Sequence, residues 1–178
     1  MSLPCKKAEK LENNKNQLAK KNFTFALAMQ PLNLPEIQYK SRTNSKGKVE
    51  VLDTIRNKYI VLTPEENVRQ HFIHYLIQDK EFPASLMAIE KGLKVNHLQK
   101  RTDIVQYAKD GKPLVIIECK APHIKINEDT FAQAAMYNIK MKVKYLIMTN
   151  GIEHFCCKVN YQTHKLEYLK AIPNYNDL

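Results

Sequence analysis

Apolar side chains recur at the spacing of an amphipathic helix between positions 68 and 77. The stretch Thr63-Pro64-Glu65-Glu66 precedes them, with Thr63 suited to the N-cap, Pro64 to the first helical position and Glu66 to a capping box. The apolar positions of the pattern are Val68, Phe72, Ile73, Tyr75, Leu76 and Ile77. The spacing predicts a helix that ends at about Lys80.

Shorter patterns predict a second helix and the strands. The second helix is expected from Glu128 to about Lys142, entered at Asn127 or Asp129. Short β-prone pieces at 38–40, 48–53 and 58–62 predict a small antiparallel flap. Further strands are predicted at 86–95, 101–108, 112–120, 143–149, 154–160 and 166–171. The order of helix, three strands, helix and further strands indicates an α/β fold with a mixed sheet.

The length of 178 residues favours a single domain behind a polar N-terminal extension. Residues 1–22 are rich in Lys, Asn, Glu and Gln, with six Lys and two Glu. Because this stretch has few large apolar groups to bury, we expect residues 1–30 to be disordered or to pack as a peripheral helix. The folded domain is then expected at 31–178.

The chain is basic, with 28 Lys and Arg against 18 Asp and Glu and a formal net charge of +10. The extension supplies +4 of this charge, which leaves +6 on the folded part. Such an excess suits a polyanionic partner such as nucleic acid, although charge alone fits plain solubility equally well.

The four cysteines indicate neither a disulfide framework nor a zinc site. Cys5 is alone in the polar extension, Cys119 lies in an apolar run, and the adjacent Cys156 and Cys157 would point to opposite faces of a strand. No apolar run approaches the roughly 20 residues that span a bilayer. We therefore expect a cytoplasmic protein without a membrane segment.

The hairpin between the two most apolar strands predicts where the chemistry lies. Asp110-Gly111 is typical of a two-residue hairpin loop in which both residues have positive φ. Such a loop sets Lys109 opposite Lys112, Val105 opposite Ile116, and Asp103 opposite Glu118. Alternation along the strand then places Lys120 on the same face as Glu118.

Two carboxylates set side by side on a mostly apolar face need a compensating charge. A hard divalent cation would supply it, with oxygen ligands from Asp103, Glu118 and the backbone carbonyl of Cys119. Lys120 would then face the substrate phosphate or the attacking water, as suits metal-assisted phosphodiester hydrolysis. The alternative is that Asp103, Glu118 and Lys120 form a salt bridge at the end of the strand.

The order Asp103, then Glu118-Cys119-Lys120, resembles the PD-(D/E)xK nuclease superfamily. With the stretches 62–70, 101–105 and 115–122, the chain is similar to the N-terminal nuclease domain of type I restriction enzyme motor subunits, from about Leu32 to the C-terminus. The resemblance implies a restriction-endonuclease-like core of helix, three-stranded meander, helix and strand, with extra strands on a mixed sheet. It also implies Mg²⁺-dependent DNA cleavage, with Mn²⁺ as an alternative ion. Asp103 and Glu118 would bind the metal and Lys120 would serve catalysis.

The resemblance implies further site residues. Gln133 and Tyr137 match a Gln-x-x-x-Tyr motif that follows the site in RecB-like nucleases, and would position DNA or Lys120. An acidic residue of the first helix assists metal binding in some members. We favour Glu65 over Glu66 for this role, against the alternative of helix capping with a Glu65–Arg69 pair. Thr102 departs from the motif, which has Pro at that position.

Basic residues near the site in sequence are candidates for contact with a phosphate backbone, although a charge run is also typical of a solvated surface. They are Arg101, Lys125, Lys140, Lys142 and Lys144. His71 and His74 fall opposite the apolar stripe of the first helix, so we expect a solvated face there rather than a metal pair.

The sequence thus predicts a metal-dependent deoxyribonuclease. The chain ends at Leu178 and leaves no room for an ATP-driven motor, which favours a stand-alone nuclease or a nuclease module that awaits a partner. The partners expected are DNA and either a second copy of the chain or subunits of a restriction or repair system. The alternatives are a non-cleaving nucleic-acid-binding module of the same fold that acts with a partner, and a purely structural subunit.

Overall fold

The computed structural model describes residues 30–90, 92–95, 98–127, 129–132, 134–135, 142–163 and 165–178. Residues 1–29 of the expected extension lie outside these ranges, so their order stays a prediction. Within the described residues, every helix is too short or too polar to cross a membrane.

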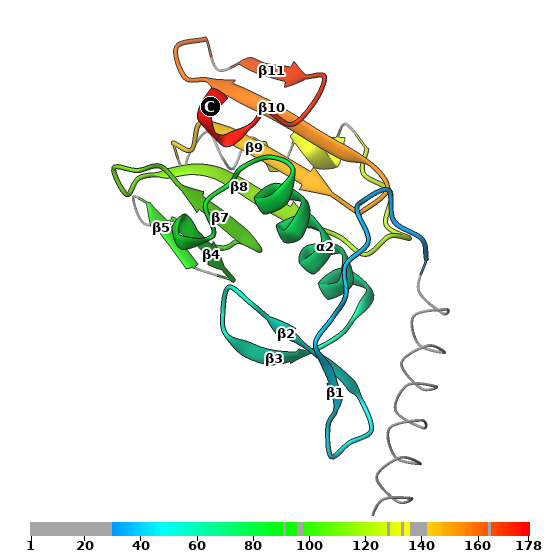
Figure 1. The fold of residues 1–178 in the computed structure, drawn as a ribbon. Helices are drawn as coiled ribbons and strands as arrows, with labels where there is room; N and C mark the ends of the chain where they lie inside the picture. Colours follow the sequence, from blue (N-terminus) through cyan, green and yellow to red (C-terminus); the bar gives the residue numbers. More distant parts are fainter. Residues whose placement is uncertain are drawn as a thin grey trace, which may run out of the picture.

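A six-stranded mixed sheet forms the centre of the molecule (Figure 1). Its spatial order is β11-β10-β9-β8-β7-β4, and only β8 and β9 run parallel. The strands are β4 (Met87–Ile89), β7 (Ile104–Tyr107), β8 (Pro113–Cys119), β9 (Tyr145–Thr149), β10 (His154–Asn160) and β11 (Lys165–Leu169). The predicted α/β class with a mixed sheet is confirmed, whereas the assignment to a restriction-endonuclease-like core stays a prediction.

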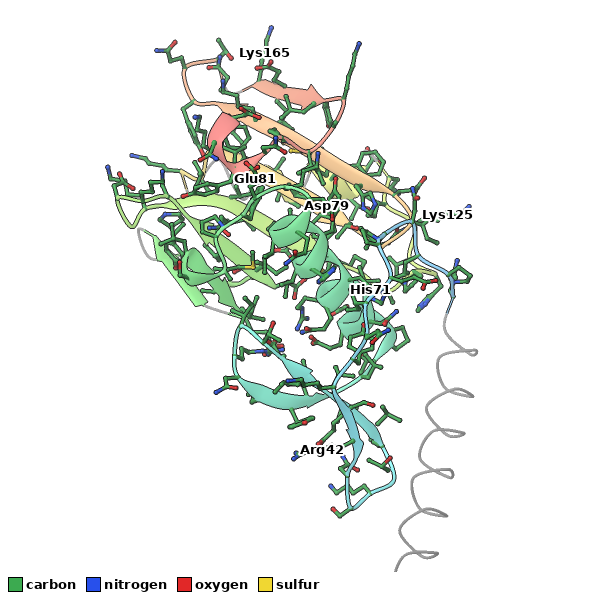
Figure 2. All side chains as sticks on the ribbon, viewed as in Figure 1. Arg42, His71, Asp79, Glu81, Lys125 and Lys165 are labelled. Atoms are coloured by element: carbon green, nitrogen blue, oxygen red, sulfur yellow. The ribbon has the colours of Figure 1, made fainter. Side chains whose placement is uncertain are left out.

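Two smaller antiparallel sheets accompany the central one. The predicted flap is the sheet of β1 (Ser41–Thr43), β2 (Val49–Asp53) and β3 (Lys58–Val61), with its first strand a few residues later than expected. The other is the hairpin of β5 (Gly92–Val95) and β6 (Leu98–Arg101). Arg42 on β1 and Lys165 on β11 lie at opposite ends of the molecule (Figure 2).

The β5-β6 hairpin corrects two predicted strands. The runs 86–95 and 101–108 were each expected to form one strand, but each divides between two sheets. The first run breaks after β4 at Glu90, which has a positive φ of 51°. The second breaks at Thr102 and Asp103, between β6 and β7. Apolar periodicity did not locate these breaks because the residues on both sides remain strand-forming.

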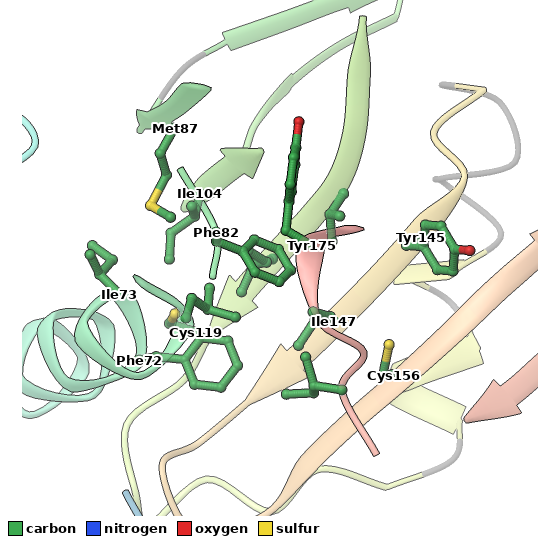
Figure 3. Packing of buried hydrophobic residues seen from close by; sticks show 14 of the residues in the cluster. Phe72, Ile73, Phe82, Met87, Ile104, Cys119, Tyr145, Ile147, Cys156 and Tyr175 are labelled. Atoms are coloured by element: carbon green, nitrogen blue, oxygen red, sulfur yellow. The ribbon is translucent and has the colours of Figure 1, made fainter. Parts of the chain in front are cut away.

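Helix α2 (Pro64–Gln78) covers one face of the central sheet. The Thr63 side chain accepts a hydrogen bond from the Glu66 backbone N–H, and Pro64 is in the first turn, as predicted. The second hydrogen bond of a capping box would join the Glu66 carboxylate to the Thr63 backbone N–H. That part of the prediction is wrong, because the Glu66 carboxylate accepts hydrogen bonds from Arg69 and Gln70 instead. Phe72 packs in the same buried cluster as Ile104, Ile117 and Cys119 of the sheet (Figure 3).

The opposite face of the sheet is covered by the start of the second predicted helix. Residues 129–132 and 134–135 are helical, and Phe131 and Ala135 pack against Val105, Ile116 and Leu146. The Asn127 side chain accepts a hydrogen bond from the Thr130 backbone N–H at 2.8 Å, which selects Asn127 as the N-cap over Asp129. The sheet is therefore buried on both faces.

The segment before β1 docks on the turn after β9. The Asn33 N–H donates to the Gly151 carbonyl at 2.7 Å, and His154 Nε2 lies 3.2 Å from the Asn33 carbonyl. Gly151 has a φ of +84°, and a Cβ there would lie 2.7 Å from a Leu32 methyl group. Glycine is thus required both by the backbone and by the close approach of this segment.

His154 makes the stability depend on pH. Burial lowers the pKa of His154, and the hydrogen bond to Asn33 opposes this shift. A lowered histidine pKa means that the unfolded chain binds the proton first, so stability present above about pH 6.5 is lost as the pH falls. We expect the melting temperature to decrease from pH 7 to pH 5, and to decrease less in His154→Gln. The exposed His123 supplies the control, because His123→Gln should keep the wild-type slope. Equal slopes for both variants would contradict the prediction.

Candidate active site

The β7-β8 hairpin brings Asp103 and Glu118 to the same end of the sheet. The backbone pairs are Ile104 with Ile117, Val105 with Ile116, and Gln106 with Val115, which is the predicted register. Asp103 comes directly before the first of these pairs, and Glu118 comes directly after its partner. The ladder thus ends one residue short of the predicted Asp103–Glu118 pair, so both residues lie at this end of the hairpin and their direct pairing stays a prediction.

The turn that sets this register differs from the prediction. The Ala108 N–H donates to the Lys112 carbonyl at 2.8 Å, so the loop has three residues and Ala108, rather than Lys109, lies opposite Lys112. Within this loop Gly111 has a positive φ of 80° and Asp110 does not. An irregularity between Gln106 and Tyr107 shifts the pairing back by one residue. The expected register is correct because this shift offsets the longer loop.

Asp103 is held by both of its carboxylate oxygens. Oδ2 accepts a hydrogen bond from the Cys119 backbone N–H at 2.7 Å, and Oδ1 accepts one from Arg69 Nη2 at 3.2 Å. The ion-pair partner of Asp103 is therefore Arg69 on α2. Among the described residues, the expected alternative of a salt bridge from Lys120 to Asp103 or Glu118 is absent. Lys120 is instead anchored by its backbone N–H, which donates to the Thr149 carbonyl at 2.8 Å.

The buried Cys119 thiol feels the negative charges of Asp103, Glu118 and Glu65. Burial raises the pKa of Cys119 well above its ordinary value, and the three negative charges raise it further while Arg69 opposes them. Glu118 is only 8% exposed. The cysteine between the motif residues is therefore kept as a neutral, buried thiol, and whether its carbonyl binds an ion stays a prediction.

Two arginines connect this end of the sheet to α2 and to the flap. Arg69 Nη1 lies 2.7 Å from Glu66 and 3.4 Å from Glu90. Arg56, in the turn between β2 and β3, lies 2.7 Å from Glu90 and 3.5 Å from Glu66, and also binds Asp53 at 2.6 Å. The sequence analysis named neither arginine as part of the site. Arg69 could have been found, since it lies one residue after Val68 on the buried stripe of the helix and a cation there needs an anionic partner.

Glu65 and Glu66 have different environments. Glu65 is 45% exposed in its side chain and contacts Arg69 Nη2 at 3.5 Å, the same nitrogen that binds Asp103. Glu66 is buried between the two arginines, and its burial raises the pKa of its carboxyl group against the effects of Gln70, Arg69 and Arg56. The Glu65–Arg69 pair, which was the alternative to a metal-binding role of Glu65, is present, whereas the metal-binding role stays a prediction. Glu65 is more exposed to solvent than Glu66.

Among the side chains that the structure describes, carboxylates outnumber cations at this end of the sheet. The carboxylates are Asp53, Glu65, Glu66, Glu90, Asp103 and Glu118, and the nearby cations are Arg56, Arg69 and Lys120. In the part of the chain that the structure describes, no three His, Cys, Asp or Glu side chains are grouped as a metal site.

The basic residues predicted beside the site fall into two groups. Lys125 is exposed in the loop after β8, which Asn150 holds at the carboxylate end through a 2.9 Å hydrogen bond to the Ile124 carbonyl. Lys142 and Lys144 precede β9, and the pairing of Val115 with Tyr145 places them at the opposite end of the sheet. These two lysines are therefore distant from the site in space, and any contact with a phosphate backbone would be made at the other end of the sheet.

The remaining predicted residues are outside the site or outside the described residues. Gln133, Tyr137 and Lys140 lie outside the described residues, and so does the side chain of Arg101. The expectation of a solvated face fails for His71, which is partly buried and lies 2.9 Å from both the Tyr39 hydroxyl and the Asn67 carbonyl. Burial lowers the pKa of His71, and its contact with Tyr39 joins α2 to the segment before β1.

The sequence match that decides the family spans most of the folded part. Residues 64–173 match the family described as type I restriction enzyme R protein N terminus (HSDR_N). The chain belongs to this family. The range that matches the R-protein N-terminal family includes Asp103, Glu118 and Lys120.

Among solved structures, the R-protein N-terminal chain is similar to a fragment of an HsdR subunit of a type I restriction enzyme from Vibrio vulnificus YJ016. The two share 18% sequence identity with a TM-score of 0.47. The similarity covers 66% of this chain and 24% of the other, so the present chain corresponds to about a quarter of that subunit fragment. No curated protein matches the chain.

Proposed function

We propose that this chain is a metal-dependent deoxyribonuclease domain that hydrolyses phosphodiester bonds of DNA. The observation that carries the proposal is the position of Asp103 and Glu118 at one end of the β7-β8 hairpin, with Lys120 following Glu118 and Glu65 near the same strand end. The proposed partners are DNA and the other subunits of a type I restriction complex. A homodimer remains an alternative arrangement.

The residues at this end suit a hard divalent ion. Mg²⁺ is usually held by one or two carboxylates together with water and substrate phosphate oxygens, and Mn²⁺ accepts similar oxygen ligands. Asp103 and Glu118 would be the protein ligands, with the Cys119 carbonyl and Glu65 as further candidates. The excess of carboxylates over cations supports this assignment, because it makes a bound cation favourable. When bound, the ion would activate water and stabilise the charge on the phosphate.

The chain's own residues orient the ligands and bind the substrate. Arg69 and the Cys119 N–H fix the two oxygens of Asp103, which limits the orientations of the carboxylate before substrate arrives. Lys120, partly buried after the end of β8, would donate to a non-bridging oxygen of the scissile phosphate. Arg69 acts through Asp103 and is therefore a positioning residue.

The decisive experiment is a cleavage assay on the full chain. Linear, circular and single-stranded DNA are incubated with the protein in Mg²⁺, in Mn²⁺ and in EDTA. We expect cleavage in the presence of either ion and none in EDTA. Absence of cleavage on every substrate in both ions would overturn the proposed activity.

A non-cleaving nucleic-acid-binding module is the second candidate, and one observation favours it. Both oxygens of Asp103 already have a partner within the protein, which is the arrangement expected of a structural ion pair. A binding module predicts that the wild-type protein binds DNA equally well with and without the divalent ion and leaves the DNA intact.

Lys120→Met tests the proposed role of the ammonium group. Met retains most of the apolar stem but removes the charge, so DNA cleavage should fall by about 10² to 10³. The free energy of unfolding should change little, because Lys120 forms no ion pair with Asp103 or Glu118 among the described residues. Cleavage rates and urea unfolding are measured on the same samples. Lys109→Met, at an exposed position at the other end of the hairpin, is the matched control. Undiminished cleavage by Lys120→Met would exclude a catalytic Lys120.

A further inference from the structure

The three-stranded sheet β1-β2-β3 has one face toward the body of the molecule and one toward solvent. Val51 and Asp53 of β2 are fully buried, so alternation turns Glu50 to the outer face. Arg42 pairs with Glu50 in the ladder and therefore shares that face. On the strand at the other edge, the exposed Val61 of β3 also pairs with Glu50 and therefore lies on the same outer face.

The outer face and the tip of this sheet are basic. Lys40, Lys46 and Lys48 are exposed, and among the described residues none of them forms an ion pair. Arg42 lies over the Tyr59 ring at 4.1 Å from its centroid and binds Glu50 at 2.7 Å, so an aromatic ring lies among the cations.

The tip that carries two of these lysines has a defined turn. The Asn44 side chain accepts hydrogen bonds from the backbone N–H groups of Lys46 and Lys48, each at 3.0 Å. Gly47 has a φ of 74° and donates its N–H to the Asn44 carbonyl. The lysines are thus presented on a hydrogen-bonded turn, which reduces the entropy that their ordering by a ligand would lose.

The sheet is fixed to the candidate active site. Arg56 connects Asp53 of the sheet with Glu66 at the start of α2 and with Glu90 after β4. Figure 1 shows the sheet extending from the body beyond the start of α2. A polymer bound along its outer face would therefore be held at a constant position relative to Asp103 and Glu118.

We propose that the outer face and tip of the β1-β2-β3 sheet bind the phosphate backbone of nucleic acid beside the active site. The inference rests on the proposed function and adds the surface that holds the substrate. Carboxylates outnumber cations among the described side chains of the active site and repel a polyanion, so cations outside the site would add the attraction that binding needs. Lys142 and Lys144 lie at the wrong end of the central sheet for this purpose, whereas the three-stranded sheet is attached at the correct end.

The test measures DNA binding separately from cleavage. Affinity of the full chain for a 5′-labelled duplex is measured by fluorescence anisotropy in Ca²⁺, over a range of salt concentrations. Lys46→Glu/Lys48→Glu is compared with Lys165→Glu/Lys170→Glu, which makes the same charge change on exposed residues at the other end of the molecule. Lys46→Gln/Lys48→Gln is a milder second variant that removes the charges without reversing them.

We expect the tip variant Lys46→Glu/Lys48→Glu to bind DNA at least about tenfold more weakly, with a salt slope smaller by about two. The Gln variant should show the same change of slope, and the control should bind like the wild type. Wild-type affinity of both tip variants, an equal loss in the control, or no DNA binding by the wild-type protein would each overturn the proposal. Cleavage in Mg²⁺ tests the nuclease separately: tip-dependent binding without cleavage would refute the nuclease and leave the binding surface standing.

Discussion

Glu118→Gln is expected to abolish Mg²⁺-dependent DNA cleavage while the protein stays folded. The amide has nearly the shape of the carboxylate but no charge, so it removes a proposed metal ligand without leaving a cavity. Glu118 is buried, and its charge acts on the Cys119 thiol together with those of Asp103 and Glu65, so removal of one of these like charges should leave the free energy of unfolding unchanged or raise it. Cleavage and chemical unfolding of the same preparation give both readouts.

Metal binding by Glu118→Gln is measured independently of cleavage. An ion that binds only the folded state raises the melting temperature, and the rise grows with the logarithm of the ion concentration above its Kd, so added Mn²⁺ should stabilise the wild-type protein and not the variant. Glu167→Gln, on the exposed face of β11, makes the same chemical change away from the site and should respond to Mn²⁺ like the wild type. Equal stabilisation of Glu118→Gln and the wild type would show that the ion binds elsewhere.

The central hairpin shows how far local sequence rules extend. Two apolar strands around a turn suffice to predict that Val105 lies opposite Ile116. The loop itself was assigned one residue too short, and an irregularity beside Tyr107 offsets that error. The loop length and the strand irregularity depend on packing against both layers of the domain. The dipeptide Asp110-Gly111 alone determines neither of them.

The ion network could not be derived from local patterns. Arg56 and Glu90 are 34 positions apart, and their 2.7 Å contact exists because the flap folds back onto the end of β4. Helical spacing does give the Glu65–Arg69 pair, since residues four apart lie on the same side of a helix. It does not reveal that Arg69 also binds Asp103, which belongs to a different layer of the fold. The candidate ligands were therefore predictable, and the groups that orient them were not.

Arg69→Met is expected to destabilise the protein by about 3–5 kcal/mol, because it leaves Asp103 without its ion-pair partner and Glu66 with only the more distant Arg56. The Arg69 side chain is 5% exposed and lies 2.7 Å from Glu66. Arg42→Met is a stringent control, since Arg42 binds Glu50 at the same 2.7 Å but is 56% exposed. Solvent screening should make that loss much smaller than the loss in Arg69→Met. Urea unfolding compares the two variants, and similar losses would contradict a special role for the buried pair.

The pH dependence of Arg69→Met separates lost charge from lost packing. Burial already raises the pKa of Glu66 in the wild-type protein, and removal of Arg69 should raise it further because a compensating charge is lost. A carboxyl group with a raised pKa binds its proton more readily in the folded state, so the folded variant gains stability relative to the wild type as the pH falls from 7 toward 5. The loss in free energy of unfolding relative to the wild type should therefore become smaller over this range. The double variant Arg69→Met/Glu66→Gln should recover part of that loss at pH 7. A deficit that is constant with pH and unchanged by Glu66→Gln would instead mean that Arg69 stabilises the fold through packing of its stem.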